Sequence, residues 1–161
     1  MEQKRVIYDL KTGLAKAEAY CAYQERSQQE VRDKLYSWGL HSREVEQAIA
    51  TLIETNFLNE ARFAAAYVSG KFRIKKWGRQ KIRQGLKLKR VPDQMIARAL
   101  KTIDGDAYLE TIVALAEKKL PLLGTADPFK RKYKLLTYLQ GRGFESDVIL
   151  DALKNSGLLE K

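Results

Sequence analysis

The stretch VRDKLYSWGLHSREVEQAI, residues 31–49, decides the fold because its apolar spacing recurs twice further along the chain. IRQGLKLKRVPDQMIARAL follows at residues 82–100, and LLTYLQGRGFESDVILDAL at residues 135–153. The positions that stay apolar are Val31, Leu35, Leu40, Val45, Ala48 and Ile49, then Ile82, Leu86, Val91, Ile96, Ala99 and Leu100, then Leu135, Leu139, Phe144, Ile149, Ala152 and Leu153. We therefore predict three copies of one repeat.

The spacing of apolar residues between turn signals is that of helices. One predicted face carries Phe63, Ala66, Tyr67, Gly70 and Ile74, and another carries Leu109, Ile112, Val113, Ala116 and Leu120. No run alternates apolar and polar residues for long enough to predict a strand. The chain is therefore predicted to be all-α.

Residues that favour helix starts recur at equivalent places. Ser42, Asp93 and Ser146 each stand just before the last helix of a repeat, where a side-chain oxygen can accept free backbone N–H groups. Ser27 and Glu30 have the spacing of a capping box at the start of the first repeat's second helix. These signals favour three real repeats over chance periodicity in an ordinary helical bundle.

The ends of the second helices are marked in a similar way. Gly39 and Gly143 occupy one equivalent position, where a glycine can end a helix in the left-handed conformation, and Arg90 takes that position in the middle copy. In the third repeat, Asp127 and Pro128 suit the N-cap and the first helical residue.

Each repeat is therefore predicted to hold three helices. We expect them over residues 13–26, 28–38 and 42–54, then 59–76, 79–89 and 93–102, then 106–119, 128–141 and 146–155. We divide the chain into an N-terminal extension, 1–12, and repeats at 13–55, 56–104 and 105–161, together one continuous helical-repeat domain. Short repeats stack on their neighbours, so we predict an elongated, curved array, most simply a monomer.

The whole excess of positive over negative charge can be assigned to one stretch, KFRIKKWGRQKIRQGLKLKR, from Lys71 to Arg90, which we call the basic segment. The chain has a net charge of +10, and outside this segment the basic residues balance the 20 acidic ones. The candidate binding residues are its ten cations, Lys71, Arg73, Lys75, Lys76, Arg79, Lys81, Arg83, Lys87, Lys89 and Arg90, with Tyr67 and Trp77 as possible aromatic contacts.

Such a local excess attracts phosphates or an acidic protein surface. The alternative is a solvated helix face on which Lys and Arg stems cover apolar surface. If Ile82 and Leu86 face the core, Arg83 and Lys87 point outward. Tyr67 and Trp77 can stack on bases or sit at the centre of an interface, although both also fit as helix-packing residues. The last helix of each repeat carries little positive charge, which favours contact with a nucleic-acid backbone or an acidic surface over base reading.

The residues needed for catalysis are scarce. His41, the only histidine, lies in a turn, and Cys21, the only cysteine, fits a buried helical position and a reducing cytosol. No phosphate-binding glycine motif or zinc-ligand set occurs. We therefore predict no enzyme activity, no cofactor and no metal. The sequence also shows no signal peptide or membrane span, so we predict a cytoplasmic protein.

Three motifs are distinctive: NFLNEARFAAAYV at 56–68, KKWGRQKIRQGL at 75–86 and KLLTYLQGRGFESDVI at 134–149. They resemble the bacterial RecX proteins, modulators of the RecA recombinase, and the resemblance covers about residues 15–155. It implies an array of three three-helix repeats that binds RecA and its single-stranded DNA filament in the filament groove. There it would inhibit filament growth, ATP hydrolysis and strand exchange, and so modulate recombination, DNA repair and the SOS response.

Lys76, Arg79, Arg83 and Lys87 are the residues that we expect to contribute most to filament or DNA binding. A plain nucleic-acid-binding protein acting without a recombinase is the alternative, and an enzyme with a carboxylate site is a third possibility. The chain departs from the family pattern at Gly85, where an acidic residue is usual, and at Arg90, where glycine is usual. Both changes raise the positive charge, and Gly85, which costs about 1 kcal/mol within a helix, is expected to fray the second helix of the middle repeat.

Overall fold

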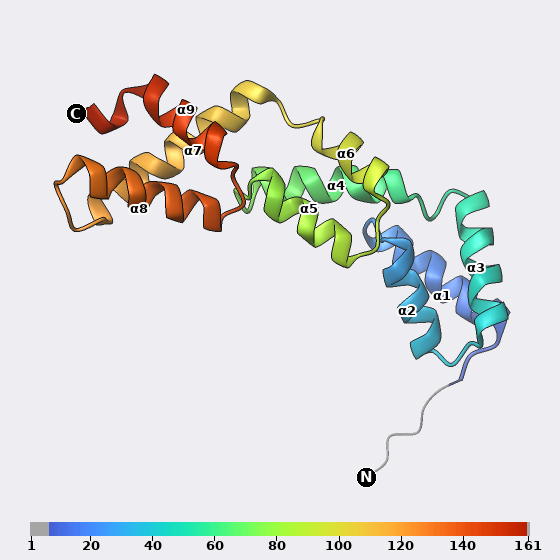
Figure 1. Cartoon of the computed structure of the whole chain (residues 1–161). Coiled ribbons are helices and arrows are strands. Elements are labelled where there is room, and N and C mark those ends of the chain that lie inside the picture. Colours follow the sequence, from blue (N-terminus) through green and yellow to red (C-terminus); the bar gives the residue numbers. More distant parts are fainter. Residues whose placement is uncertain (1–6, 161) are drawn as a thin grey trace, which may run out of the picture. The chain divides into compact units, whose positions relative to one another are not determined.

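The computed structural model describes residues 7–160, and over these residues the chain is all-α (Figure 1). The nine α-helices of this part are α1 Leu10–Tyr23, α2 Gln28–Ser37, α3 Ser42–Glu54, α4 Glu60–Arg73, α5 Arg79–Leu88, α6 Asp93–Leu100, α7 Gly105–Lys119, α8 Pro128–Gly141 and α9 Ser146–Ser156. Two 3-10 helices, η1 Leu120–Leu122 and η2 Leu158–Glu160, follow α7 and α9. The predicted tandem three-helix pattern is confirmed.

The repeated apolar positions form the core. All eighteen residues that the sequence comparison aligned are buried, and none is more than 5% exposed. Complete burial of a Leu, Ile or Val side chain contributes about 1.5–3 kcal/mol to the free energy of unfolding. These recurring buried side chains therefore supply much of the stability of each repeat. Cys21 is also buried, as predicted.

The described chain forms two compact units. The first contains residues up to Ala66 together with Leu86–Ile96, and the second contains Tyr67–Gly85 and the residues from Ala97 onward. The boundary falls inside α4, α5 and α6, so the middle repeat contributes helical residues to both units.

The first helix begins earlier than predicted. It starts at Leu10 instead of residue 13, because the Asp9 carboxylate accepts a hydrogen bond from the Thr12 N–H at 2.8 Å and caps it. Just before it, the Tyr8 N–H donates to the Trp38 carbonyl at 2.9 Å, and the two rings meet edge to face. Residues 8–12 therefore pack with the first repeat, while residues 1–6 of the predicted extension lie outside the described residues.

All three N-caps predicted for the last helices of the repeats are wrong by one residue. Ser42 and Ser146 are the first helical residues of α3 and α9, and the N-caps are His41 and Glu145. His41 takes this role because Glu44 completes a capping box: His41 Nδ1 accepts from the Glu44 N–H at 3.5 Å, and the Glu44 carboxylate accepts from the His41 N–H at 3.4 Å. The only histidine is thus an exposed structural cap.

Asp93 is likewise the first residue of α6. The capping box of Ser27 and Glu30 and the cap at Asp127, with Pro128 after it, are confirmed.

The left-handed helix ends are also confirmed. Gly39 and Gly143 have φ angles of +89° and +98°, and Arg90 adopts +58° at the equivalent position.

The predicted apolar faces of α4 and α7 are only partly correct. On α4 the buried apolar residues are Phe63, Ala64, Val68 and Phe72, whereas Ala66 is exposed. The buried face is rotated because Phe72 stacks on Tyr108, with ring centroids 5.8 Å apart. Ile74 lies beyond the end of α4 and is 78% exposed. On the face predicted for α7, Ile112 and Ala116 are buried as predicted, Val113 and Leu120 are half-buried, and Leu109 is 38% exposed.

Candidate functional site

The basic segment covers the end of α4, the loop at residues 74–78 and α5 with the turn after it. The loop lies backbone to backbone against the third repeat, within the second compact unit. The Gly78 N–H donates to the Arg142 carbonyl at 2.8 Å, and a Cβ on Gly78 would come within 2.4 Å of the Gly143 backbone. The space around Gly143 is equally small, since a Cβ added there would lie 2.4 Å from Lys81 Cβ. The absence of side chains at Gly78 and Gly143 therefore allows the close contact that positions the loop and its lysines.

Arg142 holds the same loop from the third repeat. Its guanidinium donates to the carbonyl oxygens of Lys75 and Lys76, with Nε 3.3 Å from the latter. These carbonyls follow the C-terminal end of α4, where the backbone dipoles favour a cation. Arg142 is not among the residues predicted from the sequence, and the only signal for it there is its place beside Gly143.

Trp77 lies between two lysines of the segment. The ammonium groups of Lys71 and Lys81 are 4.7 Å and 4.6 Å from the centre of its ring, and Lys71 is also 5.4 Å from the centre of the Tyr67 ring. Each such contact contributes about 0.5–1 kcal/mol at an exposed site. The half-buried indole thus holds two cations in place, which favours the packing interpretation of Trp77.

Arg79 belongs to a half-buried polar cluster around the buried Tyr108. Its guanidinium lies 3.9 Å from the centre of the Tyr108 ring, and Nη1 is 3.0 Å from Glu145 Oε2. Its backbone N–H donates to the Tyr108 hydroxyl at 3.0 Å, and that hydroxyl donates to Glu145. Burial, reinforced by the Glu145 hydrogen bond, raises the pKa of Tyr108, so the phenol stays neutral. The charge of Arg79 is compensated internally, and its geometry favours a structural role.

The remaining cations differ in how firmly they are paired. Lys87 is 3.9 Å from Asp93, and Lys89 is 3.8 Å from Glu30. Exposed pairs of this length contribute little, about 0–1 kcal/mol. Within residues 7–160, the exposed cations of the segment that form no ion pair are Arg73, Lys75, Lys76, Arg83 and Arg90. These five are the most available to an anionic partner.

Gly85 has a specific packing reason. A Cβ at this position would lie 2.0 Å from the Tyr67 hydroxyl oxygen, so the glycine provides the space that the tyrosine occupies. Helix α5 is continuous through Gly85 to Leu88, and the predicted fraying is therefore not seen.

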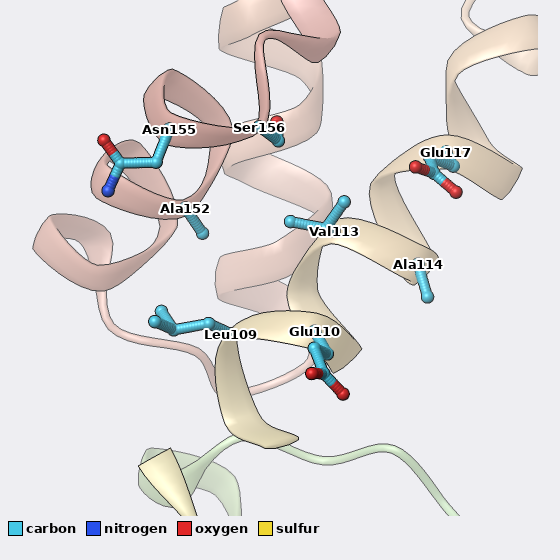
Figure 2. A pocket seen from close by; sticks show the side chains of 8 residues that line it. All are labelled: Leu109, Glu110, Val113, Ala114, Glu117, Ala152, Asn155 and Ser156. Atoms are coloured by element: carbon cyan, nitrogen blue, oxygen red, sulfur yellow. The ribbon is translucent and has the colours of Figure 1, made fainter. Parts of the chain in front are cut away.

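A separate hollow of about 400 Å³ lies between α7 and α9 (Figure 2). Leu109, Val113 and Ala152 contribute apolar surface, and Glu110 and Glu117 add carboxylates. The hydroxyl group that lines the hollow, on Ser156, is not hydrogen-bonded to a general base of the described chain. Ser156 Oγ donates to the Leu153 carbonyl at 2.9 Å and accepts from the Leu158 N–H at 3.2 Å, so both of its bonds serve the end of α9.

The described residues contain neither a candidate metal cluster nor a helix suited to a membrane span. No group of three or more His, Cys, Asp or Glu side chains in this part of the chain is arranged to hold a metal ion. None of the helices described combines the length and the apolar character needed to cross a bilayer.

The fold defines the class of protein: an all-α chain built from tandem three-helix domains. Models of the first, second and third three-helix domains of RecX match residues 14–52, 59–100 and 106–153. The chain therefore belongs to the RecX family.

Curated relatives and a solved structure agree with this assignment. The regulatory protein RecX of Prosthecochloris aestuarii is 34% identical over 145 residues, which cover 90% of this chain and 93% of that one. The regulatory protein RecX of Chlorobaculum tepidum is 37% identical over 125 residues, covering 78% and 76%. The crystal structure of RecX from Lactobacillus salivarius superposes with a TM-score of 0.86 at 27% identity, covering 92% of this chain and 97% of that chain.

Proposed function

We propose that this chain is a regulatory protein of the RecA recombinase. It binds RecA and RecA–single-stranded DNA filaments in the filament groove and inhibits filament growth, ATP hydrolysis and strand exchange. It thereby modulates recombination, DNA repair and the SOS response in the cytoplasm, acting as a monomer without a cofactor. Membership of a family whose curated members are named regulatory protein RecX is the observation that carries this proposal.

The five unpaired cations of the basic segment support an anionic partner. Fixed positive charge raises the rate of encounter with a phosphate-bearing strand, and each neutralised phosphate releases a bound counterion. Helices α3 and α9, which carry one basic residue each, offer little for reading bases. Contact with the strand backbone and with the recombinase accounts better for this charge than sequence recognition does.

A second candidate is a nucleic-acid-binding helical protein that acts without a recombinase. The net charge of +10 favours it independently of the family. It predicts tight binding to bare single strands that falls steeply with added salt.

Charge reversal at two exposed positions tests the proposal. The variant with Arg83→Glu and Lys87→Glu should weaken inhibition of RecA ATP hydrolysis at least tenfold, because two attractive contacts become repulsive (about 1.4 kcal/mol per factor of ten). Circular dichroism should show unchanged helicity, since both side chains are exposed.

The matched control carries Arg98→Glu and Lys154→Glu, which change the net charge equally at exposed positions outside the basic segment. The control should inhibit as the parent does. Unchanged inhibition by the Arg83 and Lys87 variant would remove these residues from the site, and equal weakening by both variants would show that only the net charge matters.

A further inference from the structure

A second stretch free of acidic residues lies in the third repeat. Residues 128–144 contain five basic residues and no Asp or Glu, although the charges outside the basic segment balance overall. Most of this charge is on the first two turns of α8, which is the second helix of its repeat, as α5 is of the middle one. Aligning Ile82 with Leu135 places Lys132 and Lys134 at the positions of Arg79 and Lys81. Positive charge therefore recurs at one place in successive repeats.

Two aromatic rings stand exposed on the same turns. Phe129 is 78% exposed and Tyr133 is 65% exposed. They are four residues apart in one helix, so their side chains are neighbours on one face. Because Leu135 and Leu139 supply the buried face of α8, neither ring is needed for the core. Exposed neighbouring aromatics mark a surface that a partner covers.

Cations border this pair of rings on both sides. At about 100° per residue, Lys130 and Lys132 lie on opposite flanks of the row formed by the two rings. Both lysines are exposed and form no ion pair within residues 7–160. The two cations beside them are held by the chain itself: Arg131 donates to the Thr125 carbonyl at 3.1 Å and Lys134 to the Leu123 carbonyl at 2.8 Å.

We propose that this face of α8 binds single-stranded nucleic acid. Bases stack on Phe129 and Tyr133, while Lys130 and Lys132 contact the phosphates on either side. This combination of aromatic stacking and flanking cations suits single strands and tolerates any base sequence. A lipid surface fits less well, because an interfacial helix needs a continuous apolar face, and here that face is turned into the core. The inference rests on the proposed function only in taking a single strand as ligand.

Fluorescence anisotropy with a labelled oligothymidylate and the full chain tests this inference. Replacing Phe129→Ala and Tyr133→Ala should weaken binding about tenfold per ring. A separate variant carries Lys130→Gln and Lys132→Gln. In it the slope of log Kd against log salt concentration should fall by about 1.4, because each phosphate contact on a single strand contributes about 0.7 to that slope. Ultraviolet cross-linking to the same oligonucleotide should map to Phe129 or Tyr133.

The controls are Tyr23→Ala, which removes a ring that is 83% exposed in the first repeat, and Lys154→Gln, which removes an exposed charge from α9. Both should bind as the parent does, and all variants should keep their helicity. Unchanged binding by the double-ring variant would overturn the inference. Failure of the parent protein to bind the bare strand would also overturn it. So would a double-ring variant that loses binding to phosphatidylglycerol vesicles but still binds the strand. None of these three results would contradict the proposed inhibition of RecA, which is measured in a separate assay.

Discussion

At the scale of single residues, backbone strain is concentrated in the basic segment. Three non-glycine residues of the described chain have positive φ angles, and two of them are Lys76 at +59° and Arg90 at +58°. This conformation costs an L-residue about 1–2 kcal/mol. Strained residues persist where the surrounding structure or the function requires them. Arg90 therefore adopts at this helix end a conformation that glycine would adopt at lower cost.

Replacing Arg90→Gly should raise the free energy of unfolding by about 1 kcal/mol, after allowance for the greater freedom of glycine in the unfolded chain. Urea denaturation measures this change, and inhibition of RecA should weaken because one unpaired cation is lost. The matched control, Arg83→Gly inside α5, should lower stability by about 1 kcal/mol. A loss of stability for Arg90→Gly would contradict the account of this turn.

Residues that act through local backbone rules could be predicted from sequence. The left-handed helix ends at Gly39 and Gly143 are examples. Gly85 shows the limit, because its purpose is to leave space for Tyr67, a residue on another helix. Arg142 was missed for the same reason, since the carbonyls it binds lie far away in sequence.

At the scale of elements, the first helix of one repeat caps the second helix of the repeat before it. In the first unit, Glu60 at the start of α4 accepts from the Gln28 N–H, the first residue of α2, at 2.9 Å. In the second unit, Tyr108 on α7 accepts from the Arg79 N–H, the first residue of α5, at 3.0 Å. Free N–H groups at helix starts require such partners. The second helices of the first two repeats, α2 and α5, thus depend on the next repeat.

Removing the hydroxyl with Tyr108→Phe tests this dependence. The variant leaves the Arg79 N–H and the Glu145 carboxylate without their buried partner, so the free energy of unfolding should fall by about 2 kcal/mol. Thermal and urea unfolding measure the loss. Tyr36→Phe, at an exposed tyrosine on α2, should change stability by less than about 0.5 kcal/mol. Equal effects of the two substitutions would argue against capping by Tyr108.

The cap that Glu60 provides for α2 depends on pH. Burial raises the pKa of its carboxyl above the usual value, so the folded state binds the proton more tightly than the unfolded state does. The stabilising contribution of the protonated form is complete below the unfolded pKa of about 4.3 and is lost as pH rises through the folded pKa.

Glu60→Gln keeps a neutral acceptor for the Gln28 N–H at every pH. The stability of this variant relative to the parent should therefore rise between acidic and neutral pH, as urea denaturation at several pH values would show. Glu54→Gln, at an exposed carboxylate, is the control and should show no such trend. A relative stability that falls toward neutral pH would contradict the raised pKa.

The order and type of the helices followed from periodicity, because the same apolar spacing was repeated three times and each copy is buried. The N-caps of α3 and α9 did not follow from it. Glu145 precedes α9 but gives its carboxylate to Arg79 and Tyr108, so it makes no capping bond. Competition of this kind depends on contacts between repeats, which spacing along one helix does not reveal.

At the scale of the whole molecule, charge and family membership together define the proposed activity. Composition identified the basic segment, and the structure separates its cations into those that hold the fold, such as Arg79, and those left unpaired, such as Arg83. Formal charge alone could not make this distinction, because the partners of Arg79 lie in the third repeat.

The most direct test of the central claim is the rate of DNA-dependent ATP hydrolysis by the cognate RecA, titrated with this protein, alongside its binding to the same bare single-stranded DNA. The account predicts inhibition well below the protein concentration that saturates the bare strand, because the filament is the target. Inhibition that appears only when the bare strand is saturated would contradict it, since the protein would then be competing with RecA for DNA.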